Sequence, residues 1–292
     1  MADIEFPVST ESDGRFVRDI IRNDLNISSG LLTKLKKNGG IRLNGKNVTV
    51  AQKVCAGDLL TILFPPEKSE TIQSVNIPLD IIYEDKYILA VNKPKDMPTH
   101  PSVGNHTNTL ANACMYYYRD TDFVFRSITR LDRDTTGIVL IAKDARTSAL
   151  MSAAMQSGDL HKTYYALTSG IPSLLCGRID APIGRADNSI LKREVRPDGQ
   201  NAVTEYKTLA CDSRIALVEI LLLTGRTHQI RVHFSHIGCP LLYDYMYGTE
   251  IPGETLYLHC GKLEFTHPVT KEKMLLSVKP DFPFFKEQLP DN

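Results

Sequence analysis

The sequence has no apolar run long enough to cross a membrane. Its longest apolar segments, around Ile215–Leu223 and Gly137–Ala142, fall short of the roughly 18 residues that mark a candidate span, and one contains Glu219. The first residues, Met-Ala-Asp-Ile-Glu-Phe, also lack the basic and apolar regions of a secretory signal. We therefore expect a globular protein of the cytoplasm, with no membrane partner.

The sequence also lacks the patterns of disulfide frameworks, zinc sites and nucleotide sites. Its six cysteines are scattered without a C-x-x-C pair, so we expect reduced thiols. No P-loop, G-x-G-x-x-G or H-E-x-x-H pattern is present. His228 and His233 would lie about 140° apart around a helix, whereas zinc pairs prefer a spacing of about four residues. A metal-dependent hydrolase using the histidines at 228, 233 and 236 stays open as an alternative, but this spacing disfavours a metal site.

The chain has no net charge, with 34 basic and 34 acidic residues, which taken alone argues against a nucleic-acid partner. The distribution of charge carries more information. No acidic residue lies between Lys34 and Lys53, and the basic residues of this stretch are Lys34, Lys36, Lys37, Arg42, Lys46 and Lys53. Such a run is either a solvated face or a surface that binds RNA.

Residues 13–64 have the pattern of a small unit of their own. Apolar residues at helical spacing predict one short helix near 16–25 and a second near 31–35, ended by Gly39 and Gly40. Asn44-Gly45 predicts a hairpin between strands at 41–43 and 48–50, and another strand is expected at 59–64. From about residue 14 to 63 this order resembles the S-four RNA-binding domain. The resemblance implies a basic RNA-facing surface made by Lys34, Lys36, Lys37, Arg42 and Lys46.

Residues 65–77 are polar and rich in turn residues, so we expect a linker. From 78 to 292 the chain alternates short strands with polar turns and two or three helices. Strands are expected at 162–168, 203–209 and 215–223, and a helix after Asp144 that runs through Met155 to Gly158. Without regular βαβ spacing, this mixture predicts an α+β domain on a mixed, mainly antiparallel sheet.

The most informative segment is 129–143, Thr-Arg-Leu-Asp-Arg-Asp-Thr-Thr-Gly-Ile-Val-Leu-Ile-Ala-Lys. A polar loop containing Asp132 ends at Gly137, where an apolar strand begins. Asp132 is thus expected at the mouth of a sheet, between Arg130 and Arg133. A carboxylate held ionised by nearby guanidinium groups can act as a nucleophile or a base.

This segment resembles the H-R-L-D-x-D-T-S-G motif of the RluA-type pseudouridine synthases, with Thr129 in place of the histidine and Thr136 in place of the serine. Other motifs of that family follow the same chain order. They are Asn92-Lys93-Pro94 with His100-Pro101, Lys162-Thr-Tyr164-Tyr-Ala166, Pro182-Ile-Gly184-Arg185, and Thr224-Gly225-Arg226-Thr227-His228-Gln229-Ile230-Arg231-Val232-His233.

The resemblance assigns roles to particular residues. It implies that Asp132 is catalytic, that Tyr164 is the active-site tyrosine and that Arg231 pairs with the carboxylate. Neighbouring strand residues face opposite sides of a sheet, so Tyr165 is expected to point away from the site. Arg231 is expected on a short helix bracketed by Thr227 and Gly238. Arg130 would fill the gap left by a flipped uridine, while Arg133, Arg193, Arg226 and His228 are expected to contact RNA.

Together these features predict an RNA pseudouridine synthase. Such an enzyme detaches uracil at nitrogen 1, rotates it and rejoins it through carbon 5, and it needs no cofactor. We expect a monomer acting on ribosomal RNA, or alternatively on transfer RNA. A non-enzymatic RNA-binding protein with the same fold is the other alternative, which an intact set of Asp132, Tyr164 and Arg231 disfavours.

Overall fold

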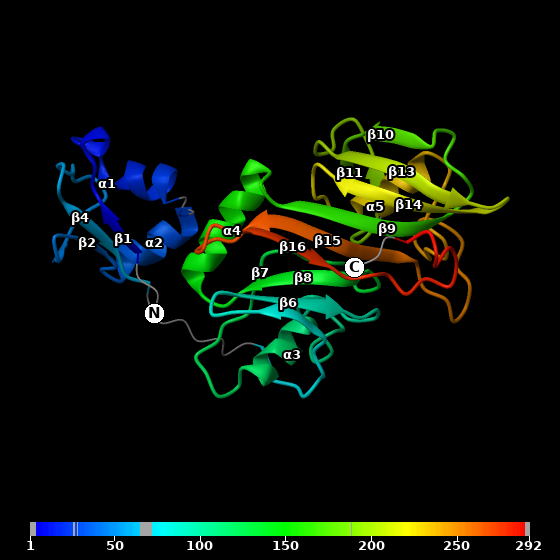
Figure 1. Cartoon of the computed structure of the whole chain (residues 1–292), viewed down its shortest axis with the longest axis horizontal. Coiled ribbons are helices and arrows are strands. Elements are labelled where there is room, and N and C mark those ends of the chain that lie inside the picture. The colour runs from blue at the N-terminus through cyan, green and yellow to red at the C-terminus, as the bar shows by residue number, and fades with distance from the viewer. Residues whose placement is uncertain (1–3, 26, 28, 65–71, 188, 290–292) are drawn as a thin grey trace.

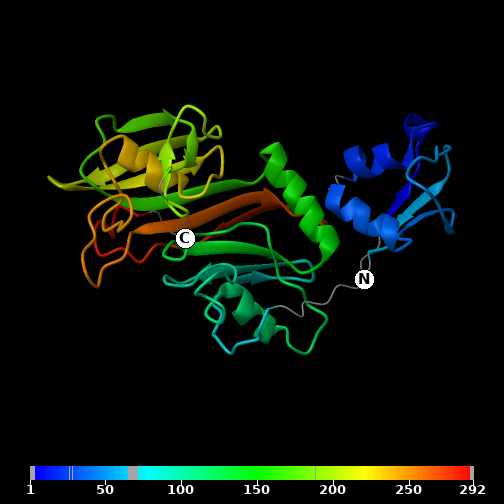
Figure 2. The same ribbon diagram turned by 180° about the vertical axis from the view of Figure 1, so that it is seen from behind.

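The computed structural model describes residues 4–25, 27, 29–64, 72–187 and 189–289. Figure 1 shows a small unit at the N-terminal end and a larger unit built on one long sheet, with the helix at 145–157 on the side of the larger unit that faces the small one. The view from behind in Figure 2 shows the same separation. Each unit has its own hydrophobic core. Among the described residues, no helix is both long and apolar enough to cross a lipid bilayer.

The N-terminal unit packs short helices on a four-stranded antiparallel sheet of order β1-β4-β2-β3. Its elements are β1 (Ile4–Pro7), a 3-10 turn (Thr10–Ser12), α1 (Val17–Asp19) continuing into a π-helical turn (Ile20–Asp24), α2 (Ser29–Lys37), β2 (Ile41–Leu43), β3 (Lys46–Asn47) and β4 (Leu59–Ile62). Because β1 pairs with β4, this unit begins before the predicted boundary at residue 13.

The predicted hairpin forms at Asn44-Gly45, where both residues have positive φ angles, of 49° and 79°. This is the backbone that a two-residue hairpin turn requires. Its return strand is Lys46–Asn47, so the strand expected at 48–50 was wrong. The paired register starts directly after the turn, with Leu43 opposite Lys46, and leaves Val48 to pack on the core of the unit.

The larger unit is α+β, as predicted, and its main sheet has the order β10-β13-β14-β9-β15-β8-β6-β5, with β16 on β15 and β7 on β8. Among the described strands, only β15 and β8 pair in parallel, so the sheet is mixed and mainly antiparallel. The elements are β5 (Ile81–Glu84), β6 (Ile88–Lys93), α3 (Leu110–Tyr117), β7 (Arg126–Ser127), β8 (Thr136–Ala142), α4 (Ala145–Ser157), β9 (His161–Ser169), β10 (Cys176–Asp180), β11 (Ile183–Arg185), β12 (Arg193–Val195), β13 (Val203–Cys211), β14 (Ile215–Leu222), α5 (Gln229–His236), β15 (Leu258–Thr266) and β16 (Lys273–Ser277).

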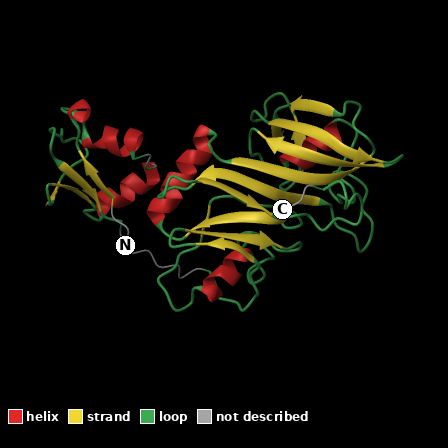
Figure 3. Ribbon diagram, viewed as in Figure 1, coloured by secondary structure: helices red, strands yellow, loops and turns green. Residues whose placement is uncertain are grey.

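Figure 3 shows how few helices this sheet carries, with α3 at the β6 end and α5 at the β13 and β14 end. The core buries the apolar strands β6 and β8 almost completely, together with one side of α3 and of α5. Strands β11 and β12 form a separate two-stranded ribbon. The ribbon rests on α5 through a small apolar cluster in which Ile183 and Val232 are buried.

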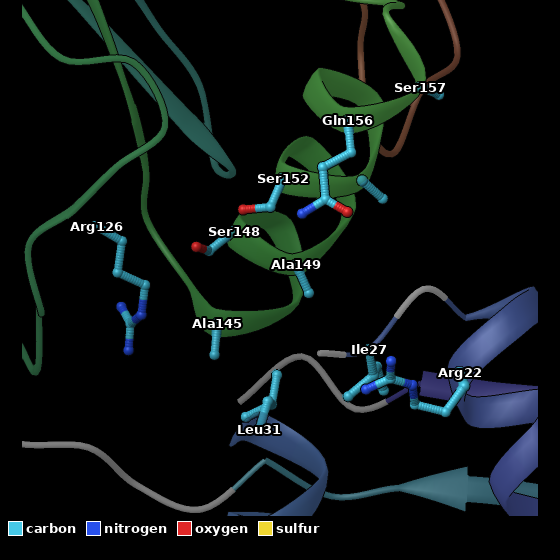
Figure 4. Close-up of a pocket in the computed structure, with 11 residues that line it drawn as sticks. Arg22, Ile27, Leu31, Arg126, Ala145, Ser148, Ala149, Ser152, Gln156 and Ser157 are labelled. Carbon is cyan, nitrogen blue, oxygen red and sulfur yellow. The ribbon is translucent and has the colours of Figure 1, made fainter. Parts of the chain in front are cut away.

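Helix α4 forms as the sequence predicts. The Asp144 side chain accepts a hydrogen bond from the Thr147 N–H (2.8 Å), and Gly158 ends the helix with a φ of 85°. One side of α4 and the N-terminal unit enclose a cavity of about 490 Å³, which Figure 4 shows with Leu31 and Ala145 facing each other across it. Ala145 also packs against the N-terminal core, so α4 is where the two units meet.

The predicted linker at 65–77 lies partly outside the described residues, which resume at residue 72. Residues 72–77 lie against α3 rather than free of either unit. The Val75 N–H donates to the Asn112 carbonyl (3.2 Å), and the Asn112 amide donates to the Gln73 carbonyl (2.7 Å). The larger unit therefore begins at or before residue 72, earlier than the predicted boundary at 78.

Candidate active site

The loop containing Asp132 joins β7 to β8 and is fixed at several points. The Thr99 hydroxyl donates to the Leu131 carbonyl (2.9 Å) and accepts from the Leu131 N–H (3.2 Å). The Thr129 hydroxyl accepts from the Leu140 N–H (2.9 Å), so the residue that replaces the motif's histidine ties this loop to β8. The Asp132 side chain is left about one third exposed, at the N-terminal end of β8.

The end of β8 nearest Asp132 requires glycine. Gly137 has a φ of +105°, and a Cβ there would lie 2.2 Å from the Cys260 carbonyl oxygen. Any other residue would therefore force β15 away from β8. The close approach places the start of β8, and the loop before it, directly beside β15.

A buried lysine holds the same loop in place through hydrogen bonds. The Lys93 ammonium donates to the carbonyls of Pro94 (2.9 Å), Met97 (2.8 Å) and Arg133 (3.0 Å). Burial lowers the pKa of Lys93 to about 7, opposed by the charges of the nearby aspartates, including Asp132. Lys93 thus joins the Asn-Lys-Pro turn to the backbone next to Asp132, which gives the upstream motif a structural function.

Arg231 lies on α5 and is almost fully buried, with its Nη1 3.5 Å from Asp132 Oδ2. The rest of its guanidinium is held by Asp244, through Nε to Oδ2 (2.7 Å) and Nη2 to Oδ1 (2.8 Å). Burial alone would lower the pKa of Arg231, but its hydrogen bonds to Asp244 and the charges of Asp244 and Asp132 raise it. Arg231 therefore stays charged and aims one nitrogen at Asp132.

Asp244 is the functional residue that the sequence reasoning missed. Its carboxylate is completely buried and also accepts the N–H groups of Met246 (3.0 Å) and Tyr247 (3.2 Å). One signal was present in the sequence, because Asp244 is the only acidic residue between Glu219 and Glu250 and stands among apolar and aromatic residues. Such an acid needs a cationic partner once it is buried.

Tyr164 lies on β9 with its side chain in the main core, while Tyr165 points to the other face of the sheet, as predicted. Burial, together with the neighbouring Cys260 and Asp132, raises the pKa of Tyr164 well above its ordinary value. The Tyr164 hydroxyl therefore keeps its proton at any physiological pH. It can donate a hydrogen bond or a proton in the site but cannot act as a resident phenolate.

Residues 87–236 match the RNA pseudouridylate synthase family. The chain is also 41% identical to the uncharacterized RNA pseudouridine synthase YjbO of Bacillus subtilis, over 86% of this chain and 90% of that protein. The chain belongs to the RNA pseudouridylate synthase family. It is an RluA-type RNA pseudouridine synthase, and the α+β fold agrees with that.

Other relatives and a solved structure agree with this membership. The ribosomal large subunit pseudouridine synthase D of Haemophilus influenzae is 35% identical over 80% of this chain and 78% of its own. The structure of human RNA pseudouridylate synthase domain containing 4 matches with a TM-score of 0.55 and 26% identity, over 71% of this chain and 90% of that one. This family membership argues against the alternative of a metal-dependent hydrolase.

His228 stands at the start of α5 in this synthase, in a left-handed conformation with a φ of 57°. Its Nδ1 shares a hydrogen bond with the Tyr247 hydroxyl (2.8 Å), and its Nε2 lies 3.8 Å from Asp132 Oδ2. Burial lowers the pKa of His228 and favours the neutral ring, while the charge of Asp132 opposes this shift. The helix runs from Gln229 to His236 with His228 as its N-cap, inside the predicted bracket of Thr227 and Gly238.

Among the described residues, neither Arg130 nor Arg133 forms an ion pair with Asp132. Arg133 forms a bidentate pair with Asp134 (2.9 and 3.0 Å), so it does not hold Asp132 ionised as its position suggested. Arg130 is exposed. Burial of His100 lowers the pKa of its ring, and the charge of Arg130 lowers it further. The charged partner of Asp132 is instead Arg231 on α5, and the His228 ring on the turn before α5 lies 3.8 Å from the carboxylate.

The remaining predicted site residues divide into two groups. Arg193 on β12 and Arg226 on the turn before α5 line a cavity that also includes Thr227, the residue before His228. The others are exposed on the N-terminal unit: Lys34, Lys36, Lys37, Arg42 and Lys46. His233 is fully buried, with its ring nitrogens bonded to Thr204 (2.8 Å) and to the Ala181 carbonyl (2.9 Å), so it positions α5 and cannot contact phosphate. In the part of the chain that the structure describes, no three metal-binding side chains come together.

Proposed function

We propose that this synthase isomerises uridines in ribosomal RNA of the large subunit. The support is the activity that its relatives are named for: proteins called ribosomal large subunit pseudouridine synthase D are about a third identical to it over four fifths of the chain. A ribosomal substrate also implies that the enzyme works in the cytoplasm, and we propose that it does so as a monomer.

We further propose that Asp132 is the group that reacts with the bound uridine. The observation that carries this assignment is its carboxylate, about one third exposed and within 4 Å of Arg231 and His228. Arg231 is always charged and fixed by Asp244, so it favours the ionised carboxylate and limits its orientations. An ionised, oriented carboxylate can act as a nucleophile or as a base, and both routes break the bond at nitrogen 1 and form one at carbon 5.

Arg130 and Tyr164 are placed to contact the RNA when the target nucleotide is flipped out, Arg130 at the gap in the stack and Tyr164 at the flipped base. A uridine in a helix is hidden, so it must leave the stack before Asp132 can reach it. Arg130 is exposed on the loop two residues before Asp132, and its planar guanidinium can stack in the gap left behind. Tyr164 is buried on the sheet side of the site, where its ring can contact the base and its hydroxyl can donate a proton.

The N-terminal unit is proposed to dock the RNA, as its resemblance to the S-four domain implies. The five basic residues assigned to RNA contact are exposed and lie on α2 and on the hairpin β2–β3, the elements that form the RNA-facing surface in that domain. Lysine and arginine side chains on such a surface bind phosphates without reading sequence. The unit would therefore supply affinity, and the larger unit the chemistry.

The direct test is to map pseudouridine in ribosomal and transfer RNA from cells with and without this protein. We expect sites in the large ribosomal RNA to disappear and to return with the wild-type gene but not with Asp132→Asn. In vitro, Asp132→Asn should lower the single-turnover rate more than about a thousandfold, because the amide keeps the shape without the charge. Sites lost only from transfer RNA would refute the ribosomal assignment, and a variant within about tenfold of wild type would refute Asp132.

A further inference from the structure

Three arginines converge on a cavity of about 300 Å³ beside the Asp132 site. Two of them, Arg185 and Arg193, are directly opposite each other on the ribbon β11–β12. The third, Arg226, comes from the turn before α5, and its neighbour Thr227 also lines the cavity. The three side chains come from separate segments of the chain, so the tertiary structure gathers the charge here.

The acids of this region are already occupied. Asp198 lines the cavity, but its carboxylate accepts two hydrogen bonds from Arg196 (2.6 and 3.0 Å). Arg196 also forms an ion pair with Asp187 and lies 3.7 Å from Glu194. Arg226 has neutral partners, the Asn201 carbonyl (2.9 Å) and the Gln200 amide oxygen (3.0 Å). Within the described ranges, none of the three cavity arginines forms an ion pair with a carboxylate.

Two features of this arrangement favour an anion in the cavity. Like charges placed directly opposite on paired strands repel, as Arg185 and Arg193 must. In addition, Arg193 Nη1 is buried and has no hydrogen-bond partner. A buried charged donor without an acceptor is costly, and a phosphate would supply both the negative charge and several acceptor oxygens. Arginine is well suited to phosphate because its planar fork matches two of those oxygens.

A chain of contacts joins this cavity to the reacting carboxylate. The Arg193 N–H donates to the Tyr247 hydroxyl (2.9 Å), which is bonded to His228, and His228 lies 3.8 Å from Asp132. The ribbon is also fixed to α5, the helix of Arg231, by the packing of Ile183 and Val232. An anion in the cavity would therefore be held at a set position relative to the bound uridine.

We propose that this cavity binds a backbone phosphate of the RNA next to the target uridine, through Arg185, Arg193 and Arg226. The proposal rests on the RNA-modifying function but not on which RNA is modified. The ribbon then anchors the strand beside the flipped nucleotide, whereas the N-terminal unit binds RNA elsewhere.

The test uses the full-length protein and a uridine oligomer of roughly twelve nucleotides, a length within the range that one binding groove covers. Binding is measured against salt concentration for wild type, Arg185→Gln and Arg226→Gln. The matched control is Arg178→Gln, which removes an exposed arginine of β10 that is paired with Glu205 (3.0 Å). Arg185 is exposed, so its replacement poses little risk to folding. A second arm follows thermal unfolding in inorganic phosphate against chloride of equal ionic strength.

We expect each cavity variant to bind about fivefold to tenfold more weakly and to flatten the slope of log affinity against log salt by about 0.7, the loss of one phosphate contact to a single strand. The control should keep the wild-type slope. Slopes equal to wild type in both cavity variants would overturn the proposal. Strong stabilisation of wild type by inorganic phosphate, with unchanged RNA slopes, would also overturn it and indicate a site for free anions. If the slopes change but no ribosomal uridine depends on the protein, the cavity stands and the ribosomal assignment falls.

Discussion

Replacing Asp244 by alanine tests whether the Asp132 site depends on a carboxylate that never reaches the substrate. The change leaves the Arg231 guanidinium, whose side chain is 3% exposed, with Asp132 at 3.5 Å as its one charged partner among the described residues. Breaking a buried ion pair costs about 3–5 kcal/mol because the remaining charge stays desolvated. Asp132 offsets part of this, so we take about 3 kcal/mol, which lowers Tm by roughly 6–12 °C for a unit of this size.

The rate should fall more than the stability explains. Without Asp244, nothing fixes Nε and Nη2 of Arg231, and the guanidinium can move relative to Asp132. A displacement of about 1 Å near a reacting group can cost roughly a hundredfold in rate. We therefore expect the single-turnover rate at saturating RNA to fall about a hundredfold at a temperature where the variant is still folded. Asp120→Ala, which removes an exposed carboxylate, is the control and should leave rate and stability unchanged.

A double variant separates the two effects. In Arg231→Met combined with Asp244→Leu, apolar side chains replace the buried pair and no desolvated charge remains, a change that is often neutral or stabilising. The double variant should therefore be more stable than Asp244→Ala while remaining inactive. The reasoning is refuted if Asp244→Ala keeps its rate within about threefold of wild type. It is also refuted if the double variant recovers activity.

Three further predictions follow from the same structure. Arg231→Met alone should fold with reduced stability and be nearly inactive in single turnover; a near-normal rate would remove Arg231 from the site. Removing residues 1–64 should weaken RNA binding and its salt dependence, but the rate at saturating enzyme should persist because the two cores are separate; a collapsed saturating rate would show that the N-terminal unit helps to build the site. Burial lowers the pKa of His259 from about 6.5 to about 4, so between these pH values the unfolded chain binds a proton that the folded protein does not. The folded state therefore loses about 3 kcal/mol of stability as the pH falls from 6.5 towards 4. Urea unfolding at pH 7 and pH 4.5 should show a smaller loss for His259→Gln than for wild type, and equal losses would contradict the assignment.

Local sequence determined the features that depend on a few neighbouring residues. Asp144 and Gly158 mark the two ends of α4, because a side-chain cap and a left-handed glycine act within one helical turn. Asn44-Gly45 made its hairpin for the same reason, since both residues tolerate positive φ. The alternation of Tyr164 and Tyr165 follows from strand geometry alone. The order of the family motifs then placed Asp132 in its loop before β8.

Only the tertiary structure decided which charges meet. Arg133 is adjacent in sequence to both Asp132 and Asp134, and it pairs with Asp134, the more buried of the two. Arg231 and Asp244 pair across a helix end and a turn, a contact that no local periodicity encodes. Electrostatic pairing depends on distance and desolvation in space, and both are set by how the chain packs over long separations. The cavity between the ribbon and the turn before α5 arises in the same way, because its arginines come together only when β11, β12 and that turn pack against one another.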